Sequence, residues 1–278
     1  MDNFNLKIIK IIKTYILNDT NLNKLFNHHN QKYLIDDLLM AIIIILTKGI
    51  PYRDISRYTN INWNTVYKFK MKLINYNIME KVFHNIVKLY LIELDKPSKI
   101  LCTDTSLIIN KLGIDMISNN PQLKKHKTTK ISIITDDFNV PLDVNIYNSN
   151  SNDAAILYNQ LDELYKNNPI LCTDNNILLG DAAYDSNKIR NKMKELKLGN
   201  ILTGTNLRNT KDINKINERA HTFKEKMVLK TRIRIEHIIN IYKKFKRLHI
   251  RYDKYVNNYK SYLYFASIII IIRKTNMF

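Results

Sequence analysis

The hydrophobic pattern of the chain changes at Lys99, and this change limits the folds that the sequence can form. Beyond it, short apolar runs typical of β-strands occur at residues 99–109, 130–136, 140–148, 176–180 and 200–206. Helical patterns separate the last three of these runs. Three strands in succession, followed by alternating helix and strand, predict a mixed α/β sheet in RNase H-like order.

The N-terminal third has helical patterns throughout. We therefore expect an all-helical domain at residues 1–96, followed by the α/β domain at 97–278. Lys96-Pro97-Ser98 marks the boundary, because a proline disfavours helical backbone in the residue before it. A buried helix at 34–49 is expected to end at Gly49.

Part of the helical domain has the pattern of a helix-turn-helix. A short helix at 51–61 is followed by turn residues at 62–64 and by a basic, aromatic helix at 65–77. Bundles of three helices are common, so this pattern alone does not distinguish a nucleic-acid reader from a structural bundle. Three lysines of the second helix are candidates for contacts with DNA phosphates: Lys68, Lys70 and Lys72.

The chain is strongly basic. Its 278 residues include 44 Lys and Arg against 25 Asp and Glu, which gives a formal net charge of +19. Residues read from A/T-rich codons dominate, and this bias explains part of the lysine content but not the scarcity of acids. A polyanion is the expected partner. We favour nucleic acid over a membrane surface, because no basic amphipathic terminal helix is evident.

Several patterns argue for an intracellular protein without a membrane span. The apolar runs at 38–46 and 262–272 are shorter than the ~18 residues that a spanning helix needs. Lysines interrupt the N-terminal segment where a signal peptide would be apolar. Cys102 and Cys172 lie in apolar, strand-like runs, so we expect both to be reduced core residues.

Two acids lie where neighbouring strands of the predicted sheet would meet. Asp104 interrupts the apolar run of the first strand, and Asp181 follows the apolar run of the fourth. An acid within a strand is unfavourable unless something offsets its desolvation. Ligands of open α/β sheets gather at strand ends. If these two strands are neighbours, the two carboxylates lie a few ångströms apart.

A third acid lies in a basic helical segment at 227–249. One stripe of this expected helix holds Glu236 among bases, and apolar side chains cover most of the opposite side. Three converging carboxylates repel one another unless divalent cations lie among them, and Mg²⁺ prefers oxygen ligands. Taken singly, each acid has a simpler explanation as a turn residue or as part of a solvated surface. Arg234 interrupts the apolar side, and the sequence does not explain it.

Four other carboxylates compete for the site and are ranked below these three. Asp136 and Asp137 fall in the turn of the expected 130–148 hairpin. Asn152 or Asp153 is expected to cap the helix at 152–167, which explains Asp153, and Asp185 is explained as a cap of the helix that starts at Ser186.

The sequence resembles a known family, the DDE transposases of the insertion-sequence type, group five and related DDE superfamily endonucleases. The segments that carry the resemblance are CTDTS around Asp104, residues 127–154, LLGDAAYDS at 178–186, and Arg232, Glu236 and Lys243 with spacers of three and six residues. Residues 46–69 are similar to the DNA-binding region of the same group. Leu229 stands where the family has a tyrosine, Asn152-Asp153 replaces a His-Asp pair, and 127–130 lacks a glycine.

The resemblance implies an enzyme that cuts DNA at the ends of a mobile element and joins them to target DNA by two-metal phosphoryl transfer. Asp104, Asp181 and Glu236 would be the catalytic metal ligands, with Mg²⁺ or Mn²⁺ as cofactor. Arg232 and Lys243 would hold phosphates. The implied partners are double-stranded DNA, as terminal inverted repeats and target, and further copies of the chain in a homodimer or higher assembly.

Two other functions stay open at this point. One is an inactive or domesticated transposase remnant that still binds DNA. The other is a stand-alone RNase H-like nuclease without joining activity, which shares the metal site but does not bind paired terminal repeats. Retention of all three acids argues against the remnant.

Overall fold

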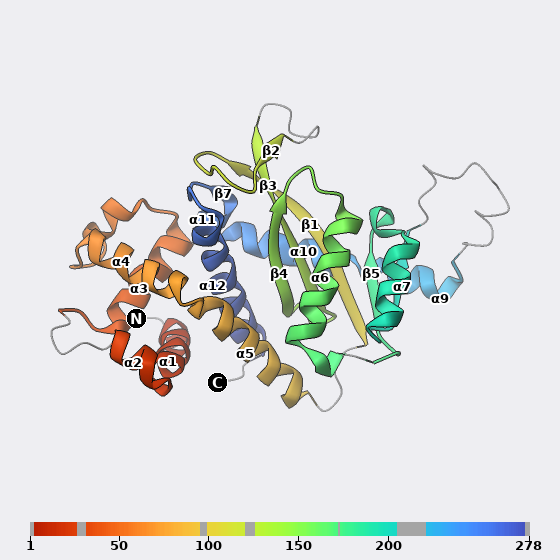
Figure 1. Cartoon of the computed structure of the whole chain (residues 1–278), viewed down its shortest axis with the longest axis horizontal. Coiled ribbons are helices and arrows are strands. Elements are labelled where there is room, and N and C mark those ends of the chain that lie inside the picture. The colour runs from red at the N-terminus through yellow and green to blue at the C-terminus, as the bar shows by residue number, and fades with distance from the viewer. Residues whose placement is uncertain are drawn as a thin grey trace. The chain divides into compact units, whose positions relative to one another are not determined.

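A computed structural model describes residues 3–26, 32–94, 99–119, 126–171, 173–204 and 221–275 (Figure 1). The chain divides into two compact units. The helical unit comprises Met1–Ile86, Ile109–Asp115 and Tyr242–Phe278, and the sheet unit comprises Val87–Ile108 and Met116–Ile241. The predicted boundary at Lys96-Pro97-Ser98 and the predicted core residue Cys172 lie outside the described residues.

The N-terminal region is helical, as predicted. Its elements are α1 (Asn3–Asn18), α2 (Thr20–Phe26), α3 (Ile35–Lys48), the 3-10 helix η1 (Tyr52–Arg57), α4 (Trp63–Asn75) and α5 (Ile78–Glu93). Gly49 ends α3 with a left-handed φ of 69°, which confirms the predicted stop. The predicted short helix, turn and second helix are present as η1, an Asn62 cap and α4. Val66, Phe69 and Leu73 of α4 are buried.

The sheet confirms the predicted RNase H-like strand order. Its main strands pair in the order β4-β3-β1-β5-β6, and the two-residue strands β2 and β7 add to β3 and β1. β1 and β5 are parallel, as are β5 and β6, whereas β3 and β4 form an antiparallel hairpin. The bounds are β1 (Ile100–Asn110), β2 (Ser118–Asn119), β3 (Lys127–Asp136), β4 (Pro141–Asn148), β5 (Ile177–Gly180), β6 (Asn200–Thr203) and β7 (Ile250–Arg251).

Asp136 is a turn residue of the β3–β4 hairpin, as the sequence predicted. Its Oδ1 accepts hydrogen bonds from the backbone N–H groups of Phe138 at 3.0 Å and Val140 at 2.8 Å. The Tyr90 hydroxyl donates to its Oδ2 at 2.5 Å. Asn139 has a φ of 62°, which asparagine tolerates better than most residues.

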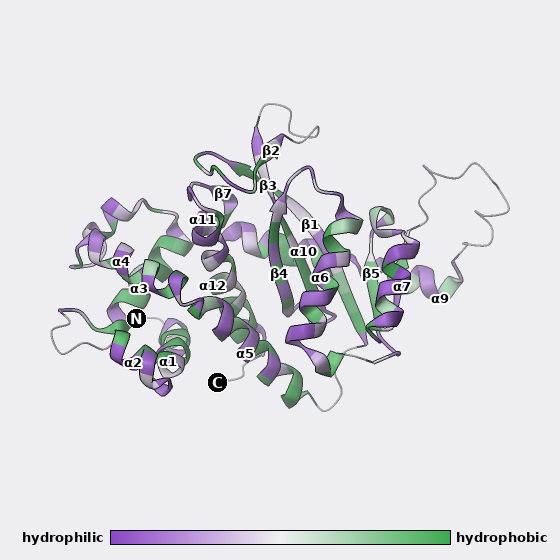
Figure 2. Ribbon diagram, viewed as in Figure 1, coloured by the Kyte–Doolittle hydropathy of each residue, from purple (hydrophilic) through white to green (hydrophobic). Residues whose placement is uncertain are grey.

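Helices cover the sheet within the sheet unit. α6 (Asp153–Asn167) buries Ile156, Leu157, Leu161 and Leu164, and α7 (Asn187–Glu195) buries Ile189 and Met193. In Figure 1 α6 lies in front of the strands and the first turns of α10 pass behind them. Figure 2 shows apolar residues concentrated on the strands, whereas α7 is mostly hydrophilic. The sheet is therefore the apolar core of this unit.

The prediction of one helix over 227–249 is wrong. The segment forms parts of three helices, α9 (Phe223–Lys230), α10 (Ile233–Lys244) and α11 (Lys246–His249). The Thr231 hydroxyl donates to the Val228 carbonyl at 2.6 Å, and such a local bond competes with the helical ladder. Phe245 is extended, with φ −70° and ψ 105°. The predicted apolar side is nevertheless buried at Ile235 and Ile238.

The C-terminal helix α12 (Val256–Thr275) holds the apolar run noted in the sequence, and its residues 261–272 are all buried. Among the described residues, no helix has the length and apolar character needed to cross a membrane.

Gly199 directly precedes β6, and its replacement tests whether this position needs a residue without a side chain. Its φ is +83°, and an added Cβ would lie 2.1 Å from the Asn176 carbonyl oxygen, whereas a Cβ at Gly204 would meet its nearest atom at 3.6 Å. We predict that Gly199→Ala lowers the free energy of unfolding by at least ~2 kcal/mol and Gly204→Ala by less than ~1 kcal/mol. Urea denaturation of both variants measures this, and equal midpoints would contradict it.

Candidate active site

Strand pairing brings Asp104 and Asp181 together. The register of the parallel strands β1 and β5 pairs Cys102 with Leu179. Two residues further on, Asp104 is therefore level with Asp181, which directly follows β5. The predicted adjacency of these strands is confirmed. In parallel strands such neighbours lie about 5 Å apart along the hydrogen-bonding direction, so the two carboxylates share one small region.

Asp104 is a carboxylate in an unfavourable environment. Its side chain is 21% exposed, and its Oδ1 accepts a hydrogen bond from the Thr105 N–H at 2.8 Å. Burial raises its pKa to about 6, although this N–H and Arg232 both favour the ionised form. The negative charges of Asp181 and Asp153 raise the pKa further. A cation placed here would relieve both the desolvation and the repulsion.

Asp181 is held by the turn that follows β5. Its side chain caps the 3-10 helix η4 (Ala182–Tyr184) and accepts a hydrogen bond from the Ala183 N–H at 2.8 Å. The residue is half-buried. This cap fixes the direction of the carboxylate at the end of the strand.

Arg232 connects Asp104 to Glu236. Its guanidinium nitrogens lie 3.6 Å from a carboxylate oxygen of Asp104 and 3.6 Å from one of Glu236, whose side chain is 54% exposed. Arg234, which the sequence left unexplained, donates to the Asp137 carbonyl at 2.8 Å and ties the start of α10 to the β3–β4 turn. Lys243 follows in the last turn of α10 and belongs to the helical unit.

The residues present fit an oxygen-ligated divalent cation. Asp104 and Asp181 are hard oxygen donors, and burial raises the pKa of Asp104, so added positive charge would stabilise its ionised form. In the described parts of the chain, no three His, Cys, Asp or Glu side chains are clustered closely enough to hold a metal as they stand. Arg232 supplies the positive charge between Asp104 and Glu236 in this arrangement.

A fourth acid, Asp153, lies at the site, and of the two residues predicted as the cap of α6 it is the one that does not cap the helix. The cap of α6 is Asn152, whose side chain accepts from two backbone N–H groups. Asp153 instead accepts hydrogen bonds from the Lys130 ammonium at 2.8 Å and from the Thr105 hydroxyl at 2.9 Å. Lys130 is only 7% exposed. A chain of contacts thus runs from Lys130 through Asp153 to the residue beside Asp104.

The Gly-Asp-x-x-Tyr-Asp motif at 180–185 is explained by packing. Tyr184 is 1% exposed, and a Cβ on Gly180 would lie 2.8 Å from its ring. Burial raises the pKa of the Tyr184 hydroxyl, and the nearby charges of Asp104, Asp153 and Asp181 raise it further. Tyr184 is therefore a neutral phenol beneath the carboxylates. The motif showed this residue in the sequence, but no sequence signal gave its orientation.

Asp185 is not the predicted cap of the following helix. The residue that precedes α7 is Ser186, and the Asp185 carboxylate forms an ion pair with Arg190. Its side chain is 4% exposed, so the pairing with Arg190 offsets a desolvation cost.

Three lysines were predicted to contact phosphates, and the structure corrects this prediction for Lys70. It is 2% exposed, its ammonium donates to the Asn258 carbonyl at 3.0 Å, and it lies 3.2 Å from the centre of the Tyr262 ring. Burial lowers its pKa to about 7. Lys70 is therefore a core residue of the helical unit. Lys68 is exposed, and Lys72 donates to the Leu25 carbonyl at 3.3 Å.

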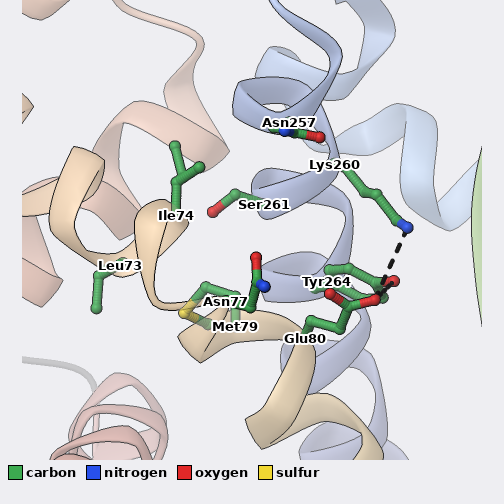
Figure 3. A pocket seen from close by; sticks show the side chains of 9 residues that line it. All are labelled: Leu73, Ile74, Asn77, Met79, Glu80, Asn257, Lys260, Ser261 and Tyr264. Carbon is green, nitrogen blue, oxygen red and sulfur yellow. Dashed lines mark hydrogen bonds and ion pairs between the residues drawn. The ribbon is translucent and has the colours of Figure 1, made fainter. Parts of the chain in front are cut away.

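A hollow in the helical unit does not resemble a catalytic site. It lies between the α4–α5 turn and α12, and its volume is about 70 Å³ (Figure 3). Glu80 accepts a hydrogen bond from the Tyr264 hydroxyl at 2.8 Å and lies 3.8 Å from the Lys260 ammonium. Its volume suits a few water molecules, not a nucleotide.

The raised pKa of Asp104 predicts that its ionised carboxylate destabilises the metal-free protein and that a bound metal stabilises it. Because its pKa is raised in the folded state, its ionisation costs stability as the pH rises from about 4 through 6. Asp104→Asn should therefore raise the melting temperature at pH 7.5 without metal, by ~2–4 °C per kcal/mol of relieved repulsion. Adding Mg²⁺ should raise the melting temperature of the wild type and leave that of the variant nearly unchanged.

Thermal denaturation of both proteins at pH 7.5, with and without 10 mM Mg²⁺, measures this. At pH 5, where Asp104 is largely protonated, the two melting temperatures should converge. A wild type that is more stable than Asp104→Asn in the absence of metal would contradict the assignment.

Comparison with known proteins gives one family and a set of similar folds. Residues 111–269 match the family described as "Transposase DDE domain". The fold is similar to piggyBac transposase, in a synaptic complex with hairpin DNA, with a TM-score of 0.52 and 12% identity over 96% of this chain and 73% of that one. The catalytic domain of Mos1 mariner transposase aligns with a TM-score of 0.30 and 12% identity over 61% and 91%. No curated protein sequence matches the chain.

Proposed function

This chain belongs to the transposase DDE domain family and is a DDE-type DNA transposase, and from that premise we propose that Asp104, Asp181 and Glu236 form its catalytic centre. The family match begins at residue 111 and therefore includes Asp181 and Glu236 but not Asp104. The observation that supports the assignment is the β1–β5 register, which makes Asp104 level with Asp181, together with Arg232 between Asp104 and Glu236.

The reaction that we propose is cleavage of DNA at the ends of a mobile element and joining of those ends to target DNA. Mg²⁺, or Mn²⁺ in its place, would be held by the three carboxylates and would supply positive charge to the attacking and leaving oxygens of an in-line displacement. Asp104 and Asp181 would be the fixed ligands, since the Thr105 and Ala183 N–H groups orient them. Glu236 is more exposed and would complete the set from α10.

Arg232 has a second part in this proposal. In the described arrangement its guanidinium is shared between Asp104 and Glu236. The planar donors of the guanidinium are well suited to a phosphate, and with the carboxylates held by a cation they would be available to bind one. Lys243, in the last turn of the same helix, is proposed to contact the DNA backbone.

The proposed partners are the terminal inverted repeats of the element and the target DNA. The net charge of +19 supports binding to a polyanion. PiggyBac transposase, whose fold is similar, forms a synaptic complex with DNA, and we propose a homodimer or higher assembly on paired ends for this chain also. We further propose that the helical region at 1–96 contacts these ends, with Lys68 on its exposed surface.

Cleavage of a labelled duplex that carries the gene's own flanking termini tests the proposal. The wild type should nick the element end in the presence of Mg²⁺ or Mn²⁺. Asp104→Ala, Asp181→Ala and Glu236→Ala should each reduce the rate by at least ~100-fold, because each removes a ligand from the transition state, while DNA binding persists.

Asp174→Ala provides a matched control, since this exposed acid precedes β5 at the opposite end of the strand from Asp181. It should cut at the wild-type rate. A wild type that binds the termini and does not cut them with either metal would refute the catalytic proposal and favour a DNA-binding remnant.

A further inference from the structure

A groove lies between α6 and α7. Its volume is about 740 Å³, which falls in the ~300–1,000 Å³ range of ligand-binding pockets. All of its lining residues belong to the sheet unit. Its charged and aromatic lining residues are two lysines, Lys188 and Lys192, one acid, Glu195, and Tyr158, with serine and asparagine side chains beside them.

The groove begins where both helices begin. α6 starts at Asp153, whose charge acts on Asp104, and α7 starts directly after Ser186, a short turn beyond Asp181. The N-termini of α6 and α7 therefore lie near the same carboxylates. The N-terminus of α6 is already capped by Asn152, whereas that of α7 has no side-chain cap, so the backbone N–H groups and partial positive charge of α7 are available to a phosphate. A strand that leaves the catalytic acids on this side would meet them first.

The side chains of the groove extend the same chemistry. Lys188 is exposed, and no carboxylate among the described residues pairs with it. The Lys192 ammonium is fixed, 2.7 Å from Asp162 and 5.2 Å from the centre of the Tyr158 ring. Tyr158 is 38% exposed, so part of its ring is open to solvent. Lysine, amide and aromatic side chains in one groove are typical of single-strand binding.

We propose that this groove binds a short single-stranded segment of the DNA that continues from the scissile phosphate. Lys188 and the N-terminus of α7 contact its phosphates, and Tyr158 stacks on an unpaired base. This inference rests on the proposed function, because it takes the reaction centre to be at Asp104 and Asp181. It adds that the groove between α6 and α7 receives the strand and that the strand is unpaired there.

The first test is electrostatic and uses two lysines of the same helix. Lys188 lines the groove, whereas Lys194 is exposed on α7 and does not line it. Fluorescence anisotropy measures binding to a terminal duplex with a single-stranded flank, at 50–200 mM salt. Lys188→Ala should weaken binding several-fold and reduce the salt slope by ~0.7, the value for one phosphate contact on a single strand. Lys194→Ala should change neither.

The second test separates stacking from charge and uses two exposed tyrosines of α6. Tyr158 lines the groove and Tyr165 does not. Tyr158→Ala should weaken binding to the flanked substrate by ~5-fold or more, the loss of one base stack, and leave binding to a blunt duplex unchanged. Tyr165→Ala should leave both unchanged. Circular dichroism confirms that every variant is folded.

Equal effects of the paired lysine variants, together with equal effects of the paired tyrosine variants, would overturn the proposal. A groove that serves a protein partner instead would give this same result. The outcome does not depend on catalysis, because binding is measured without metal. Absence of cutting by the wild type would therefore refute the proposed function. Equal affinities within each pair of variants would refute only the proposal for the groove.

Discussion

The parallel pairing of β1 with β5 is the contact on which the rest of the site depends. It makes Asp104 level with Asp181 and so places two negative charges in one half-buried region. The cost appears in the pKa of Asp104, which burial raises to about 6 and which Asp181 raises further. Proteins retain such a cost at functional sites, where stability is exchanged for reactivity.

The surrounding residues limit this cost without removing it. The Thr105 N–H and Arg232 stabilise the charge of Asp104, and the Ala183 N–H stabilises that of Asp181. Lys130 neutralises Asp153, which would otherwise add a third charge beside the pair. The site is thus negatively charged and oriented by backbone N–H groups, as the proposed metal centre requires.

Strand order and the positions of the first two acids could be predicted because they depend on local patterns. Apolar runs of five to eleven residues located the strands, and with the first and fourth strands as neighbours the two acids were expected a few ångströms apart. The roles of Asp153 and Lys70 could not be predicted in this way. A cap assignment is local, whereas the partners of Asp153 are Lys130 and Thr105, distant in sequence. Lys70 is buried by residues near position 260.

The break between α9 and α10 also escaped prediction, because a continuous 3.6-residue pattern crosses it. One Thr231 side-chain hydrogen bond accompanies the turn. The turn matters for the site, since Arg232 lies in it and Glu236 lies one turn further along α10. Local rules thus located the acids but not the basic residues that hold them.

The most direct test of the metal centre is a crystal structure of the protein soaked in Mn²⁺, with anomalous scattering used to locate the ion. The account predicts a peak within about 2.5 Å of carboxylate oxygens of both Asp104 and Asp181, with Arg232 displaced from Asp104. Manganese bound only elsewhere, with the Arg232–Asp104 pair intact, would contradict it.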